Sequence, residues 1–266
     1  MSDSLRRLVS PLVVIAVLVT VWDLCVRLTG SELVPSPGDV VTAFTGIEGR
    51  PGLLQTRPGE LYPVLIHDCV ASLFRVTWGF LLASAVGIPL GLWLGWSMRA
   101  FEAFNPLIQI LRPISPIAWI PIAIIMFRSD DVRSVFLIFI SAFFPVCVAS
   151  MAAVRSISRV HRRSAANFGL RGMALFKKVV LPASIPQILV GLRIAMGVAW
   201  LVVVAAEMIA VESGLGYLIY DARNAGRRYD LVVAGMLVIG VIGLLLDLLI
   251  RRLEGFKEVA WGFQDR

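Results

Sequence analysis

Residues 185–211 read IPQILVGLRIAMGVAWLVVVAAEMIAV, a stretch of 27 residues with two charged side chains, Arg193 and Glu207. A helix that crosses the hydrocarbon core of a bilayer needs about 20 mostly apolar residues. The stretch meets this requirement with residues to spare, so it predicts a membrane-spanning helix.

The composition of the whole chain agrees with this interpretation. Its 266 residues are 58% hydrophobic and 16% charged, whereas a soluble domain carries about a quarter charged residues. This composition excludes a disordered chain and argues against an ordinary soluble enzyme. Five further apolar stretches give six predicted spans in all, at residues 8–26, 69–96, 104–127, 135–154, 185–211 and 231–250. The predicted fold class is therefore all-α, a polytopic membrane protein with six transmembrane helices.

The segment before the second span is expected to differ from the rest of the chain. The first span begins like a secretory signal, but no small-x-small cleavage site follows it, so we expect a retained helix. Residues 29–62 then contain many helix breakers and favour a loop with at most a short helix. The breakers are Pro35, Pro37, Gly38, Gly49, Pro51, Gly52, Pro58 and Gly59.

Positive charge is unevenly distributed among the predicted loops. Residues 155–178 contain seven arginines and lysines and no acidic residue, and basic residues also occur at 6–7 and within 251–257. In a six-span chain these three stretches lie on one side, and their positive charge marks that side as cytoplasmic. Both termini are therefore predicted to be cytoplasmic. The formal net charge of +7 then reflects orientation, and no nucleic-acid partner is predicted.

Candidate metal ligands are few. Cys25, Cys69 and Cys147 form no Cys-x-x-Cys motif, and such a pattern gives neither a disulfide framework nor a zinc site. The histidines, His67 and His161, share no metal-binding spacing with acidic residues. We therefore predict no metal site.

The basic loop at residues 155–178 is too long for a simple connection between two helices. Apolar residues are interspersed with the basic ones, which predicts a short amphipathic helical pair, and Gly169 and Gly172 permit a sharp turn within it. The pattern leaves two interpretations open. The loop is either an anchor for anionic lipid and topology, or a docking helix that transmits force from a cytoplasmic partner.

Residues 163–169, RSAANFG, and the later pair Leu181-Pro182 resemble the EAA loop of type I ABC importer permeases. In that pattern a Glu-Ala-Ala precedes a glycine by a fixed interval, and Leu-Pro follows the glycine by thirteen residues. Gly169 and Pro182 match this spacing. The sequence departs from the pattern at Arg163, which stands where the glutamate would be, and at Ser164, which replaces the first alanine.

Further stretches resemble the nitrate, sulfonate, taurine and bicarbonate branch of that family, and together they cover roughly residues 67–254. They are LVPSPG at 33–38, SLFR at 72–75 with GF at 79–80, RPISPIAWIP at 112–121, GLRIA at 191–195, the stretch at 200–208, and GLG at 214–216. The order and spacing of these stretches carry the resemblance, because each alone is a weak signal.

The resemblance implies a type I ABC importer transmembrane fold with a cytoplasmic coupling (EAA) helix. Its implied domains are residues 1–66, an N-terminal transmembrane helix with a periplasmic segment; residues 67–254, the transmembrane core; and residues 255–266, a cytoplasmic tail. The residues implied to couple the chain to an ATPase are Arg163, Ser164, Ala165, Ala166, Gly169, Leu170 and Pro182.

The implied partners are cytoplasmic ATP-binding subunits, a periplasmic substrate-binding protein, membrane lipid and a second permease copy in a homodimer. The implied location is the bacterial inner (plasma) membrane. The sequence contains no Gly-x-x-x-x-Gly-Lys-Ser/Thr phosphate loop. We therefore expect no enzymatic activity, no catalytic residue and no cofactor in this chain, with ATP and Mg²⁺ held by the partner ATPase.

Charged residues within membrane spans are costly and are functional candidates for that reason. Five such residues stand out, namely Asp23, Arg75, Arg193, Glu207 and Asp247. Arg193 and Glu207 are separated by about 21 Å along one helix, so each needs a different partner or an aqueous path. Arg75 and Arg193 either attract an anion or satisfy helix-end carbonyls, and Glu207 either packs, gates or lines the path. Asp23 and Asp247 are expected to reach the interface.

The third span contains Pro113, Pro116 and Pro121 around Ser115 and Trp119. Proline removes helical hydrogen bonds, and broken helices near the membrane midplane often build transport sites. We therefore expect Ser115 to line the central path and Trp119 to form its wall or gate. The alternative is a kinked helix at a subunit interface.

The function implied by the resemblance is permeation of a small anion, namely nitrate, bicarbonate, taurine or another sulfonate, delivered by the binding protein and driven by ATP. An alternative is a secondary transporter driven by an ion gradient. A membrane enzyme is the third possibility, but Ser115 has no histidine within the spans to act as its base.

Overall fold

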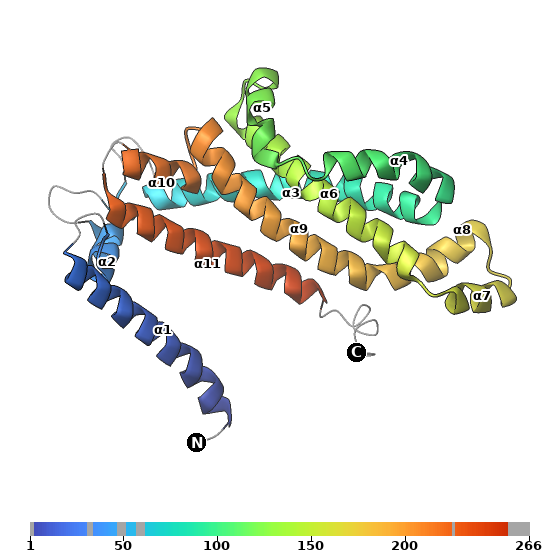
Figure 1. Ribbon diagram of the computed structural model, residues 1–266, viewed down its shortest axis with the longest axis horizontal. Coiled ribbons are helices and arrows are strands. Elements are labelled where there is room, and N and C mark those ends of the chain that lie inside the picture. The colour runs from blue at the N-terminus through green and yellow to red at the C-terminus, as the bar shows by residue number, and fades with distance from the viewer. Residues whose placement is uncertain (1–2, 31–33, 47–51, 57–61, 225–226, 255–266) are drawn as a thin grey trace. The chain divides into compact units, whose positions relative to one another are not determined.

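The computed structural model describes residues 3–30, 34–46, 52–56, 62–224 and 227–254 (Figure 1). The predicted tail at 255–266 and part of the segment at 29–62 lie outside these residues. The described residues form helices and no strand apart from an isolated bridge between Thr56 and Pro63. The chain comprises two compact units, Met1–Cys69 with Leu218–Ile239 and Val70–Tyr217 with Gly240–Arg266, and each is described by itself.

The helices confirm the all-α prediction. In chain order they are α1 (Asp3–Thr29), α2 (Pro37–Thr45), α3 (Val64–Trp96), α4 (Met98–Leu111), η1 (Pro116–Trp119), α5 (Ile120–Met126), α6 (Asp130–Ser156), α7 (Arg159–Asn167), α8 (Gly172–Leu175), η2 (Phe176–Val180), α9 (Leu181–Ala210), α10 (Leu215–Asn224) and α11 (Tyr229–Glu254). Within the described ranges, five helices are long and apolar enough to cross a membrane, and the bent pair of α4 with η1 and α5 makes a sixth crossing if it is one span.

The first unit contains α1 and the short helix expected between the first two spans. Asp23 pairs with Arg27 one turn later on α1, with 2.7 Å between Oδ2 and Nε. Helix α2 begins with a capping box, in which the Ser36 hydroxyl accepts from the backbone of Asp39 and the Asp39 carboxylate accepts from the backbone of Ser36. These reciprocal bonds satisfy donors that a helix start leaves free.

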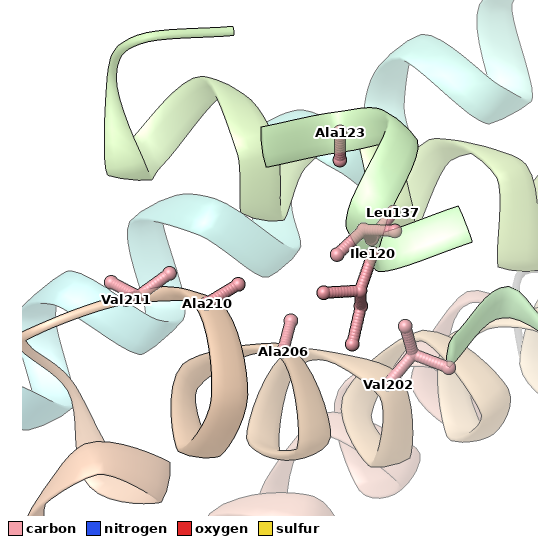
Figure 2. Packing of buried hydrophobic residues seen from close by; sticks show 7 residues of the cluster. All are labelled: Ile120, Ala123, Leu137, Val202, Ala206, Ala210 and Val211. Carbon is pink, nitrogen blue, oxygen red and sulfur yellow. The ribbon is translucent and has the colours of Figure 1, made fainter. Parts of the chain in front are cut away.

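The core of the second unit is formed by α6 and α9, which pack extensively against each other. Figure 2 shows the cluster that α5 adds to this pair, in which Val202 and Ala206 of α9 lie beneath Ile120. Small side chains allow the two long helices to approach closely, as where Gly191 of α9 lies against Ala149 of α6. Lipid provides no hydrophobic driving force between helices, so close packing of this kind stabilises their association instead.

A row of glycines on α3 packs against α6. Gly79 lies against Ile138, Gly87 against Val146, Gly91 against the carbonyl of Cys147, and Gly95 against Val154. The glycine positions are separated by four or eight residues and therefore share one face of the helix. This is the close helix packing that small residues four positions apart favour in membrane proteins.

The third predicted span is broken rather than continuous. Helix α4 ends at Leu111, and η1 with α5 continues after a bend of 86°. Pro113 and Pro116 have no N–H, so the carbonyls of the residues four positions earlier, Gln109 and Arg112, lose their usual helical donors. The break predicted from the prolines is thereby confirmed, and the crossing begins at Met98 rather than at residue 104.

We predict that Gly91→Ala destabilises the protein and that Gly240→Ala does not. A methyl group at Gly91 would collide with the α6 backbone at Cys147, whereas nothing lies within 4 Å of the same position at Gly240. Overpacking of this kind costs about 1–3 kcal/mol, and a helical Gly→Ala change in open space is favourable by up to about 1 kcal/mol. Thermal unfolding in detergent measures both effects, and equal unfolding temperatures for the two variants would contradict the packing described.

Candidate functional site

Arg75 of α3 and Glu207 of α9 meet in the interior of the second unit. Their side chains are 2% and 0% exposed, and 2.9 Å separates Arg75 Nη1 from Glu207 Oε1. Two charges removed from water are stable together only if further hydrogen bonds satisfy their remaining polar atoms. The pair therefore depends on its neighbours.

Those neighbours come from α3 itself and from three further parts of the unit. The Ser72 hydroxyl lies 2.8 Å and 2.9 Å from the two oxygens of Glu207, and the backbone N–H of Gly216 donates to Oε2 at 3.0 Å. Arg75 donates to the carbonyl and the hydroxyl of Ser213 at 2.8 Å and 2.6 Å, and its Nε donates to Asp131 at 2.7 Å. We call these residues the Arg75–Glu207 network. It joins α3, α9, the first turn of α6, the segment between α9 and α10 and the first turn of α10.

Gly214 completes the network by leaving room for the carboxylate of Glu207. Its φ of +103° is one that side chains rarely adopt, and a Cβ there would collide with the Glu207 carboxylate. Glycine alone tolerates both conditions. The GLG stretch at 214–216 thus has a structural explanation, since Gly214 admits the carboxylate and Gly216 donates to it.

A second ion pair joins α9 to α11. Arg193 Nε lies 2.6 Å from Asp247 Oδ1, and Arg193 Nη2 lies 3.2 Å from Oδ2, so the guanidinium grips the carboxylate with two nitrogens. Both side chains are partly exposed. Asp247 therefore pairs with an arginine on another span, a partner that was not predicted, and its position at the interface stays a prediction.

The break in the third span leaves Ser115 and Trp119 in different surroundings. Ser115 is exposed, and its hydroxyl makes no capping bond to η1. Trp119 is half-buried and packs on the cluster of Figure 2, which includes Ile120 and Val202. The Trp119 Nε1 atom is buried without a hydrogen-bond partner in the described part of the chain. The ring therefore packs against a cluster that includes residues of α5, α6 and α9, and its role as the wall or gate of a path stays a prediction.

The basic loop forms the helical pair that the sequence predicts. Helix α7 is capped by Ser158, whose hydroxyl accepts from the backbone of His161, and the chain turns at Gly169 with φ of +79°. Helix α8 then continues through the π-helical turn η2 into α9. In this loop Phe168 is 86% exposed although it is a large apolar side chain.

The residues predicted to couple to an ATPase lie on α7, at the turn that follows it and at the start of α9. Arg163, Ser164 and Gly169 are exposed, Ala166, Leu170 and Pro182 are partly buried, and Ala165 is buried. The loop is attached firmly to the spans, because the Phe176 ring contacts Trp96 with 5.3 Å between centroids. Val180 is also buried in a cluster with Leu92 and Val154.

The structure thus brings together some predicted site residues and separates others. Arg75 and Glu207 share a network, while Arg193 is paired with Asp247. The contacts of both arginines favour a structural role. Three partners in this network, Ser72, Asp131 and Ser213, were not predicted from the sequence. Ser72 could have been predicted, because it lies three residues before Arg75 on the same helix face. Asp131 could not, because it is 56 residues from Arg75 and no sequence pattern relates the two.

Comparison with known proteins identifies the family. Residues 87–256 match the model of binding-protein-dependent transport system inner membrane components. The chain belongs to this family of ABC transporter permeases. It is 38% identical to a putative ABC transporter permease protein of Methanocaldococcus jannaschii over 258 residues, which cover 96% of this chain and 93% of the relative.

Relatives that are named after their substrates are also similar to this permease. The nitrate import permease NrtB of Synechocystis sp. is 35% identical, with 93% of this chain and 88% of that protein covered. The taurine transport system permease TauC of Escherichia coli is 34% identical, with 90% and 85% covered. Among solved structures, a chain of the inward-facing MetNI methionine ABC transporter matches with a TM-score of 0.65 at 14% identity, covering 75% of this permease and 97% of that chain. This match shows the type I importer permease fold.

We predict that Arg75→Gln is far more damaging than Arg75→Gln combined with Glu207→Gln. The single change leaves a buried carboxylate without its cation, which costs about 3–5 kcal/mol, whereas removing both charges avoids most of that penalty. Unfolding temperature and the yield of monodisperse permease in detergent measure the difference.

Asp131→Asn is the matched control within the same network. The Asp131 side chain is 54% exposed, and an ion pair with one solvated partner contributes about 1 kcal/mol or less. The assignment of the Arg75–Glu207 network would be wrong if this control were as damaging as Arg75→Gln, or if the double variant were no better than the single one.

Proposed function

We propose that this permease forms the membrane path of an ATP-driven importer for a small anion. The family and the names of its nitrate, taurine and bicarbonate relatives support the transport of an anion. The observation that carries the proposal is the exposed surface formed by α7 and the turn after it, which present Arg163 and Phe168 to solvent. An exposed aromatic residue beside positive charge is typical of a protein docking site rather than of a simple connection.

The loop is built to transmit movement to the spans. Ala165 faces the interior, and the contact of Phe176 with Trp96 fixes the loop to the end of α3. The chain then continues as helix without interruption from Gly172 to Ala210, so a push on the turn reaches α9 directly. Helix α9 carries Arg193 and Glu207, and through them it is linked to α11 and α3.

The positive charge of the loop supports a cytoplasmic location, where an ATPase subunit would hold ATP and Mg²⁺. A second permease copy would complete the path within the membrane. The Arg75–Glu207 network then lies toward the outer face, where a substrate-binding protein would dock. In this arrangement the network keeps the outer ends of α3, α6 and α9 together while the inner ends respond to the ATPase.

Reconstitution into proteoliposomes with the ATPase and the binding protein tests the function. We expect uptake of one or more of nitrate, bicarbonate and taurine that requires ATP and the binding protein, and no uptake of methionine. Uptake driven by an ion gradient without ATP would instead support a secondary transporter. Absence of uptake for every anion in the panel, with ATPase activity present, would contradict anion import.

We predict that Gly169→Val uncouples ATP hydrolysis from uptake while the complex still assembles. Gly169 has φ of +79° with open space around it, so valine meets no steric obstacle but strains the backbone by about 1–2 kcal/mol, which displaces the turn. Uptake should fall at least tenfold, with the amount of co-purified ATPase changed less than twofold.

Gly30→Val is the control, because Gly30 also has a positive φ of +58° and open space but lies at the end of α1. This variant should transport normally. Unchanged transport in Gly169→Val would count against the docking role of the turn.

A further inference from the structure

The third span contains one charged residue that the five sequence candidates do not include. Arg112 is the sole charged residue between positions 104 and 127. It follows the last residue of α4 and immediately precedes the 86° bend. An arginine at a helix C-terminus is favourable for the helix, but its position within the span needs a further explanation.

Packing against α6 shows at which level along that helix the bend lies. On one side of it, Ile108 belongs to a cluster with Cys147 and Met151 of α6, and Phe143 packs on that cluster. On the other side, Ile120 belongs to the cluster that contains Leu137 of α6 (Figure 2). The bend therefore lies at the level of α6 between residues 137 and 147. Helix α6 has 27 residues from Asp130 to Ser156, so this level is close to its middle.

The surroundings of Arg112 are open. Its side chain is exposed, as are Pro113, Ile114 and Ser115, and within the described residues it makes no hydrogen bond or ion pair. The backbone here is not helical, and the carbonyls of Gln109 and Arg112 lack helical donors because Pro113 and Pro116 follow them. Neither an arginine nor such backbone is tolerated against hydrocarbon at mid-depth. This face of the span must therefore border water or protein.

Arg112 also differs from the other arginines within the spans. Arg75 is neutralised by Glu207 and Asp131, and Arg193 by Asp247. Arg112 has no carboxylate partner within the described residues. Its positive charge is therefore available to a ligand of opposite charge.

We propose that Arg112 binds the anionic group of the transported substrate at mid-depth of the path, with the Ser115 hydroxyl as a second donor. This inference rests on the proposed function and specifies its substrate site. A guanidinium presents a planar fork of donors that suits the oxygens of nitrate, bicarbonate or a sulfonate. One arginine without a fixed carboxylate attracts an anion yet allows it to leave, as a transport site requires.

Thiol chemistry at Ser115 tests the site without knowledge of the substrate. Cys25, Cys69 and Cys147 are first replaced by serine or alanine, and Ser115→Cys is introduced into the complex in native membrane vesicles. The rates of modification by anionic sulfonatoethyl and cationic trimethylammonioethyl methanethiosulfonate are then compared, each relative to its rate with a free thiol. We expect at least a threefold preference for the anionic reagent, and loss of that preference when Arg112→Gln is added.

Two controls accompany this comparison. Arg128→Gln removes an exposed arginine sixteen positions along the chain, after α5, and should leave the preference unchanged. Ile125→Cys, at a position that is 85% exposed on the apolar helix α5, should react slowly with both reagents if it faces lipid. The amount and unfolding temperature of each variant show that it is folded, and Arg112→Lys should retain part of the preference.

Transport kinetics provide the second measurement. For whichever of nitrate, bicarbonate or taurine is taken up, Arg112→Gln should raise the half-saturating concentration at least tenfold, with a smaller effect for Arg112→Lys. An unreactive thiol at residue 115, or a preference that survives Arg112→Gln, would overturn the proposal, since Arg112 would then contact protein instead. ATP-independent uptake with the preference intact would instead contradict the proposed function and leave this site standing.

Discussion

Hydrocarbon offers no hydrogen-bond partner to a buried charge or to a free backbone carbonyl, and the arrangement of this permease follows from that constraint. Arg75 and Glu207 are inaccessible to solvent, yet the network of Ser72, Ser213, Asp131 and Gly216 satisfies them. Removing a buried partner such as Arg75 or Ser72 would leave the others without a substitute in the membrane. The network therefore determines how α3, α6 and α9 are joined at one end of the second unit.

The same constraint separates the fixed and the open parts of the unit. Helix α3 packs closely on α6 along its length through Gly79, Gly87, Gly91 and Gly95. The charges of Arg75 and Glu207 are buried against each other and are not accessible to other ligands. The proline-broken span contrasts with both, because Arg112 and Ser115 are exposed where the backbone leaves the helix. A rigid frame with one open polar segment at mid-depth is the arrangement that a transport path needs.

Much of this arrangement could be predicted from the sequence, because membrane spans obey strict rules of length and charge. The stretch at 185–211, the break at Pro113 and Pro116, and the helical turn at Gly169 were all predicted and are present. The partners of the intramembrane charges were not, since residues as distant as Arg75 and Glu207 meet only through the packing of whole helices. Arg112 was not predicted for another reason. Its depth in the membrane depends on how the two halves of the broken span pack against α6, and the sequence does not specify that packing.

The central claim is that the turn at Phe168 receives force from an ATPase in the cytoplasm, and its accessibility tests this most directly. A single cysteine at this position, Phe168→Cys, would be labelled with a membrane-impermeant thiol reagent in inside-out and right-side-out vesicles, before and after the ATPase is stripped. We expect labelling only in stripped, inside-out vesicles. Labelling from the outer face, or equal labelling with the ATPase bound, would contradict it.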